Sequence, residues 1–139
     1  MRLLQVHLCA MYVVAGWSRL ESPSWWEGEA TFAAVSDLFY ARFDVDWQPW
    51  KGLLAVGTWA ALAFEGLAPV LLWIPRVGPV WALGLLTLHA GLEVVDNHGS
   101  WQLLMGAALL TFLPAPWLAR LLPRRLRWGG PAPTRAPRS

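Results

Sequence analysis

The chain alternates long apolar runs with short polar stretches, and four of the runs match the thickness of a bilayer. They lie at Leu3–Leu20, Trp50–Trp73, Val77–Val95 and Ser100–Leu118. A helix needs roughly 20 residues to cross the hydrocarbon core, and backbone groups in lipid must be satisfied within the segment. The pattern therefore predicts an all-α membrane protein with four transmembrane helices.

The first run has a second interpretation, because Arg2 followed by apolar residues is also typical of a cleaved signal peptide. Gln5 and His7 interrupt the run, and no Ala-x-Ala-like cleavage site precedes Arg19. We therefore interpret this run as the first membrane helix.

The stretch between the first two runs predicts one amphipathic interfacial helix over about residues 24–43. Ser24 and Glu27 have the spacing of a capping box, which predicts Ser24 as the N-cap. Helical spacing then places four apolar side chains on one face: Phe32, Val35, Phe39 and Phe43. Such a helix lies at the membrane surface or over the mouth of a bundle.

Composition strengthens the membrane interpretation. Hydrophobic residues make up 56% of the chain and charged residues 14%, whereas a soluble domain has roughly a quarter of its residues charged. The 11 Trp recur near the ends of the apolar runs, where indoles prefer the headgroup level. One cysteine, Cys9, excludes an intrachain disulfide and is most simply a small apolar filler.

The basic residues predict an orientation. With four crossings, Arg2, Arg76 and the C-terminal arginines fall on one side, which the positive-inside rule makes cytoplasmic. Both termini are then cytoplasmic, and the acidic loop 21–47 is extracytoplasmic. We expect residues 1–122 to form the transmembrane domain and the basic, Pro/Gly-rich segment 123–139 to be a disordered cytoplasmic tail. We expect the bacterial inner membrane as the location.

Ionisable side chains inside the apolar runs are the candidate functional residues, because each costs on the order of 3 kcal/mol at mid-bilayer without a partner. His89, Glu93 and Asp96 are spaced to lie on one helical face, and Arg19 ends the first helix on the same outer side. We therefore expect Arg19 to meet these carboxylates. His7 and Glu65 both lie in the inner half of their helices and form a second expected pair.

Two interpretations of these residues stay open. The first is a structural polar network that fixes helix register, and we assign His7 and Glu65 to it. The second is a pocket that opens to the outer leaflet, with His89, Arg19 and Glu93 as candidate catalytic residues. Arg19, His89 and Asp96 would then be the candidate cofactor-binding residues. The sequence contains no zinc-ligand spacing, phosphate-binding loop or nucleophile elbow, so we expect no metal and no required cofactor.

Three motifs, in order, resemble the transmembrane core shared by vitamin K-dependent gamma-glutamyl carboxylase and the HTTM (horizontally transferred transmembrane) domain proteins. The first is "YVVAGWSRL" followed by "WWEGEA", with its matching positions at Tyr12, Ala15, Gly16, Arg19, Trp25 or Trp26, and Gly28. The others are "FEGLAPVLLWIPR" and "LLTLHAGLEVVDNHGSWQLLMGAALLTFLP". The resemblance covers about residues 5–115 and implies an HTTM-like fold in a shortened form.

The sequence departs from that family in two respects. The family carries further helices before the position of Tyr12, and the carboxylase adds a large extracytoplasmic domain. The resemblance also implies a lysine base where this chain has Arg19, while His89 matches the family's histidine. Arginine stays protonated in proteins, so it holds an anion but does not readily accept a proton. We therefore do not expect carboxylase activity.

Three functions compete on this basis. The favoured prediction is a non-catalytic accessory or structural subunit of a membrane complex, whose partner is another membrane protein chain or a second copy. The alternative is a membrane-embedded enzyme or a quinone- or lipid-binding protein that uses Arg19, His89 and Glu93. A weaker third option is a small transporter or a toxin-protection protein, motivated only by the charges at mid-membrane. No feature points to nucleic acid.

Overall fold

The computed structural model describes residues 2–37, 39, 41–95 and 100–121. This part of the chain is all-helical, as predicted. Seven α-helices and two 3-10 turns follow one another in it: α1 Arg2–Leu20, α2 Pro23–Trp26, α3 Ala30–Ser36, η1 Gln48–Trp50, α4 Lys51–Leu71, α5 Gly78–Val95, α6 Ser100–Leu109, η2 Leu110–Phe112 and α7 Ala115–Leu121. The predicted tail 123–139 and Asp96 lie outside the described residues.

Two of the helical segments are long and apolar enough to cross a membrane: Gln48–Leu71, which joins η1 to α4, and Gly78–Val95, which is α5. They correspond to the second and third predicted spans. α1 has a similar length of 19 residues, but Arg2, Gln5, His7 and Arg19 make it more polar.

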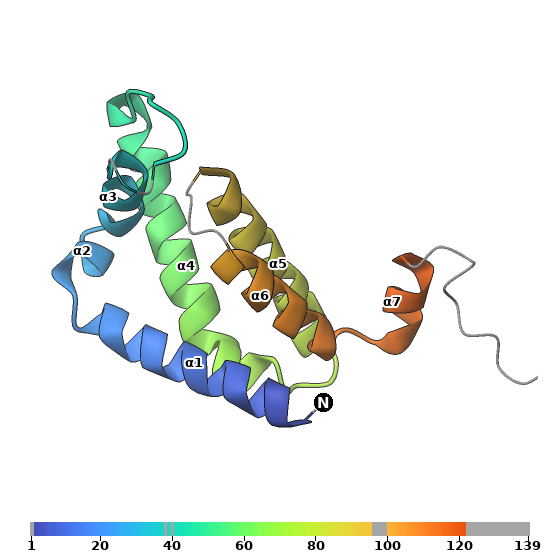
Figure 1. Ribbon diagram of the computed structural model, residues 1–139. Coiled ribbons are helices and arrows are strands. Elements are labelled where there is room, and N and C mark those ends of the chain that lie inside the picture. Colours follow the sequence, from blue (N-terminus) through green and yellow to red (C-terminus); the bar gives the residue numbers. More distant parts are fainter. Residues whose placement is uncertain (1, 38, 40, 96–99, 122–139) are drawn as a thin grey trace, which may run out of the picture.

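The fourth predicted span is interrupted, which corrects the expectation of one helix over Ser100–Leu118. α6 and η2 end at Phe112, and Leu113 has an extended backbone before Pro114. A proline disfavours the helical conformation of the residue before it, which explains the break. The chain then turns away from the bundle into α7 (Figure 1).

The predicted amphipathic helix over 24–43 is also wrong in its extent. α2 stops at Trp26 and α3 covers only Ala30–Ser36. Gly28 separates them with φ +77°, a conformation in which L side chains are strained. The capping box is wrong as well, because Ser22 is the N-cap of α2 and Ser24 lies inside that helix, beside Pro23.

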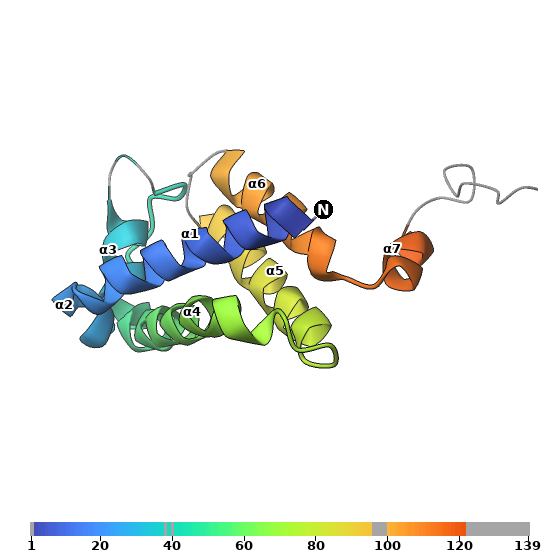
Figure 2. The ribbon, with the colours of Figure 1, turned by 90° about the horizontal axis from the view of Figure 1, so that it is seen from below.

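The short helices α2 and α3 form a cap over the N-terminal half of α4 (Figures 1 and 2). Thr58 of α4 is fully buried, and its hydroxyl oxygen accepts a hydrogen bond of 3.0 Å from the backbone N–H of Thr31. The Trp59 indole N–H donates to the Trp26 carbonyl at 3.1 Å. Lys51 pairs with Glu29 at 2.8 Å. These contacts fix the cap to α4.

The core lies among α1, α4, α5 and α6. Its buried members include Leu8, Tyr12, Leu85 and Leu109. Cys9 is buried among them, as expected for an apolar filler. α1 crosses α4 at a glycine contact, where a Cβ on Gly16 would lie 3.6 Å from the Gly66 Cα. This close approach brings the next turn of α1 against α4 and positions the site described below.

The outer faces of these helices are apolar and exposed. Leu53, Val56, Leu67 and Val70 on α4 are examples, and Val80 on α5 is 62% exposed. Contiguous exposed apolar surface of this kind is rare on soluble monomers. The helices therefore present an apolar exterior around a small core.

Candidate functional site

A cavity of about 610 Å³ lies between α1, α4, α5 and α6. Polar side chains from all four helices line it: His7, Tyr12, Ser18, Arg19, Glu65, His89 and Gln102. The rest of the wall is mainly apolar, with Met11, Val14, Leu92, Trp101 and Met105. An apolar cavity with a few convergent polar groups is the usual form of a small-molecule site. We call it the central cavity.

A buried chain of hydrogen bonds forms the deep wall of the central cavity. The Tyr12 hydroxyl lies 2.9 Å from Nε2 of His89, and Nδ1 of His89 lies 2.6 Å from Oε1 of Gln102. The Gln102 oxygen only accepts, so Nδ1 donates to it, and Nε2 pairs with the Tyr12 hydroxyl. Tyr12 is 1% exposed and His89 5%. The imidazole is therefore held in one orientation by one partner on each nitrogen.

An ion pair forms the adjoining wall. Nη1 of Arg19 donates to Oε2 of Glu65, and the guanidinium also lies 4.3 Å from the ring centroid of Trp25. Glu65 is 3% exposed, whereas the Arg19 side chain retains 23% exposure. The carboxylate is thus neutralised inside the core, and the arginine keeps further N–H donors near the cavity.

These contacts correct two expected pairings. Arg19 pairs with Glu65 of α4, whereas Glu93 of α5 pairs with Arg42. Glu65 consequently does not pair with His7, which lines the same cavity but is exposed. The register of the Gly16–Gly66 crossing explains why Glu65 is the partner of Arg19. It places Arg19 one turn beyond Gly16 on α1, and Glu65 is the residue next to Gly66 on α4.

The two described residues of the predicted α5 stripe share only part of their surroundings, because both line a neighbouring cavity of about 470 Å³ between α5 and α6 but only His89 lines the central cavity. His89 faces the central cavity, whereas Glu93 reaches the loop after α3 and accepts a bond of 2.9 Å from Nη2 of Arg42. The other carboxylate oxygen of Glu93 is buried without a partner among the described residues. Glu93 therefore does not line the central cavity with Arg19 and His89. Asp96, the third member of the stripe, is outside the described residues.

Two residues of the site escaped the sequence reasoning. Gln102 carried a usable signal, since it is a lone amide in an apolar helix and needs a buried partner. Tyr12 is the first position of the motif "YVVAGWSRL", but nothing in its local spacing points to His89, 77 residues away. Only the packing of α1 on α5 and α6 reveals that pair.

The charge of the central cavity limits the chemistry that it can support. Arg19 and Glu65 neutralise each other, and both nitrogens of His89 already have hydrogen-bond partners. Neither a dianion nor a metal ion matches such a wall, and no cluster of three or more metal-ligating side chains occurs in the described ranges. A neutral ligand with hydrogen-bonding oxygens and an apolar body fits best.

Comparisons with protein-family models, with curated proteins and with solved structures give no match for this chain.

Proposed function

We propose that the protein is an integral membrane protein whose central cavity binds a neutral lipid-soluble ligand of the quinone class. The observation that supports this most is the convergence of polar groups from four helices on one cavity with an otherwise apolar wall. The resemblance of three sequence motifs to the HTTM and gamma-carboxylase core is consistent with the proposal.

The exposed apolar faces support the membrane part of the proposal. α4 and α5 have spanning length, and only 22% of the most apolar stretch of each is buried within the isolated chain. Lipid would cover these faces without further protein. We propose that α1 and the α6–η2 segment complete a four-crossing bundle, with both termini cytoplasmic. α6 and η2 together rise only about 21 Å, so the bilayer would thin locally or the residues beyond Phe112 would extend the crossing.

The exposed donors favour a quinone over a charged lipid. Arg19, Ser18 and His7 retain exposure beside the cavity, whereas Tyr12, His89 and Gln102 lie behind them. A quinone carbonyl accepts hydrogen bonds from a guanidinium without adding charge. An anionic headgroup would have to compete with Glu65 for Arg19, and a cationic headgroup would meet the guanidinium itself.

The same geometry supports binding without carboxylation. The position that resembles the family's lysine base holds Arg19, which stays protonated and is already paired. His89 has both nitrogens engaged in the resting hydrogen-bond pattern. We therefore propose a ligand-binding role and assign no catalytic step.

Equilibrium binding of a short-tailed benzoquinone to the purified protein in lipid nanodiscs tests the proposal. Ala15→Leu places a larger side chain in the cavity wall and should weaken binding by tenfold or more. Ala63→Leu adds the same atoms at an exposed site of α4 outside that wall and should leave binding unchanged. Equal affinity of the two variants, or no saturable binding to the unmodified protein, would refute the proposal.

A second candidate is the accessory subunit predicted from the sequence. One observation favours it: the α1 rim of the cavity carries small exposed residues, Ala10 and Ser18, along which a partner helix could pack. A partner helix in this groove would exclude the quinone. Native mass spectrometry from mild detergent distinguishes the two candidates, because a lone monomer that binds quinone excludes the accessory subunit.

A further inference from the structure

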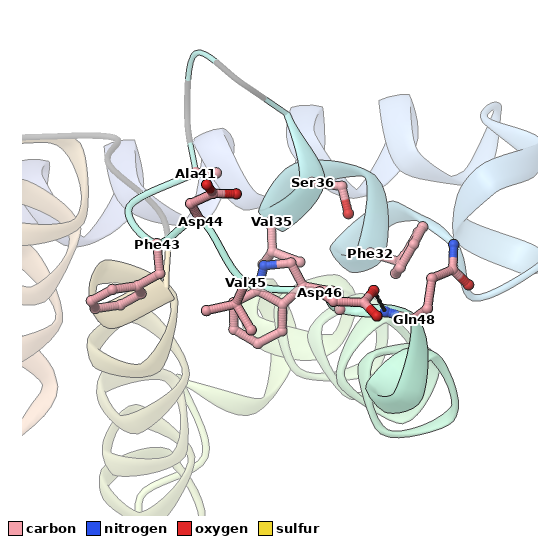
Figure 3. A pocket seen from close by; sticks show the side chains of 10 residues that line it. Phe32, Val35, Ser36, Ala41, Phe43, Asp44, Val45, Asp46 and Gln48 are labelled. Atoms are coloured by element: carbon pink, nitrogen blue, oxygen red, sulfur yellow. Dashed lines mark hydrogen bonds between the residues drawn. The ribbon is translucent and has the colours of Figure 1, made fainter.

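A second cavity lies outside the bundle, in the cap. It has a volume of about 510 Å³ and lies between α3 and the segment 41–48 that leads into η1 (Figure 3). We call it the cap pocket. Its wall includes three aromatic side chains, Phe32, Phe43 and Trp47, and two carboxylates, Asp44 and Asp46. In Figure 3, Phe32 and Phe43 lie on opposite sides of the pocket.

The two carboxylates of the cap pocket are not paired with a basic side chain in the part of the chain that the structure describes. The two basic residues between α3 and the start of α4 are engaged with other carboxylates, Arg42 with Glu93 at 2.9 Å and Lys51 with Glu29 at 2.8 Å. Asp46 uses one oxygen to accept from the backbone N–H of Gln48 at 3.1 Å (Figure 3). The pocket wall therefore favours a cation.

The aromatic wall adds a second attraction of the same sign. The faces of Phe and Trp rings attract cations, more strongly when the cation is partly desolvated. The structure already contains one such contact at the edge of the pocket, where Nζ of Lys51 lies 5.5 Å from the ring centroid of Phe32. An organic cation gains from both the rings and the carboxylates, whereas a small metal ion would gain mainly from the carboxylates.

A third feature points to a ligand oxygen. The indole N–H of Trp47, a residue of the pocket wall, is buried and has no acceptor in the part of the chain that the structure describes. Leaving a buried donor unpaired costs roughly 1–3 kcal/mol. Because this N–H is buried behind the pocket surface, a ligand oxygen next to the cationic group would accept from it only once the Trp47 side chain turned toward the pocket.

We infer that the cap pocket is a binding site for a small organic ammonium ion with a neighbouring oxygen, the chemistry of choline and ethanolamine. This chemistry has two sources, a free amino alcohol or the headgroup of a zwitterionic phospholipid. The site is separate from the central cavity, so the inference does not depend on quinone binding.

Isothermal titration of the protein in phosphatidylglycerol nanodiscs with choline tests this inference. The matched probe is 3,3-dimethyl-1-butanol, which has the shape and hydroxyl of choline but a carbon in place of the charged nitrogen. We expect choline to bind at least tenfold more tightly than this alcohol, and increasing salt to weaken choline alone. Equal binding of the two, or no saturable binding of choline, would overturn the inference.

Charge-removing variants locate the site. Asp44→Asn and Asp46→Asn should each weaken choline binding by about fivefold. Asparagine keeps a side-chain oxygen at position 46, so the bond from Gln48 is preserved. Asp37→Asn is the matched control, because Asp37 also accepts a local backbone bond, from Phe39 at 2.8 Å, but lies outside the pocket wall. An equal loss in all three variants would mean that choline responds only to the overall negative charge of this region, and it would contradict a defined site.

The same titration in phosphatidylcholine nanodiscs distinguishes the two sources. Weaker apparent binding of free choline there than in phosphatidylglycerol means that lipid headgroups occupy the pocket. Unchanged binding means that the pocket takes the free cation. Both outcomes support an ammonium site, and the second assigns it to a soluble ligand.

Discussion

Arg19, one helical turn beyond Gly16 on α1, forms an ion pair with Glu65, the residue next to Gly66 on α4, at the point where these two glycines approach each other. The glycine contact lets the two helices come close, and the ion pair fixes their relative register. Since both charges also border the central cavity, one interaction serves packing and determines the charge of the site. This relationship leads to the first prediction.

Replacing Glu65 with Gln should lower the free energy of unfolding by about 2 kcal/mol. The substitution leaves the Arg19 charge in a partly buried position without its counterion, and the residual exposure of Arg19 places the cost below the 3–5 kcal/mol of a fully buried pair. Reversible unfolding in mixed micelles measures it. Glu29→Gln, which breaks the exposed pair with Lys51, is the control and should cost at most about 1 kcal/mol. Equal losses would show that the buried pair has no special role.

Tyr12→Phe should destabilise the protein by about 1–2 kcal/mol. The variant keeps the ring but leaves Nε2 of buried His89 without its hydrogen-bond partner. Thr87→Val is the comparison on the same helix as His89, because the Thr87 hydroxyl is exposed and bonds only to the Leu83 carbonyl at 3.0 Å. The same unfolding measurement should show little change for that variant. If Tyr12→Phe behaves like Thr87→Val, the hydrogen-bonded chain does not contribute to stability.

Much of the architecture could be predicted from hydrophobic periodicity. The second and third predicted spans, Trp50–Trp73 and Val77–Val95, agree with α4 and α5 to within a few residues. These segments are long and nearly free of charge, so local sequence alone determines them. The errors occur at residues whose backbone conformation interrupts a periodic pattern, namely Gly28 in the cap and Leu113 before Pro114.

The candidate site was predictable only in part, for a different physical reason. Arg19, Glu65 and His89 were identifiable because an ionisable side chain in an apolar run needs a partner. Their partners depend on which helix faces cross, and that is set by contacts such as Gly16 with Gly66 rather than by spacing along one helix. The i, i+4 spacing of His89 and Glu93 predicted a shared face, and both do line one cavity between α5 and α6, but Glu93 pairs with Arg42 and does not reach Arg19.

Gly28→Ala should loosen the cap specifically. The residue has φ +77°, and a Cβ there would lie 2.9 Å from the Ala55 Cβ and 3.1 Å from the Trp59 ring. Strain of about 1–2 kcal/mol follows from the backbone alone. Hydrogen exchange should become faster in α2 and α3 while the interior of α5 is unchanged. Gly57→Ala, where a Cβ meets nothing within 4 Å, should leave the exchange of the cap unaltered. Similar exchange in the two variants would contradict the assigned role of Gly28.

The central claim is that the cavity bordered by Arg19 and His89 holds a neutral lipid-soluble ligand. Photo-crosslinking with an azido-benzoquinone in nanodiscs, with and without excess unlabelled quinone, tests it most directly. We predict labelling at residues 7–19 of α1 and 101–105 of α6 that excess quinone abolishes and that Ala15→Leu prevents. Labelling spread over the exposed faces of α4 and α5, and unaffected by the competitor, would contradict the claim.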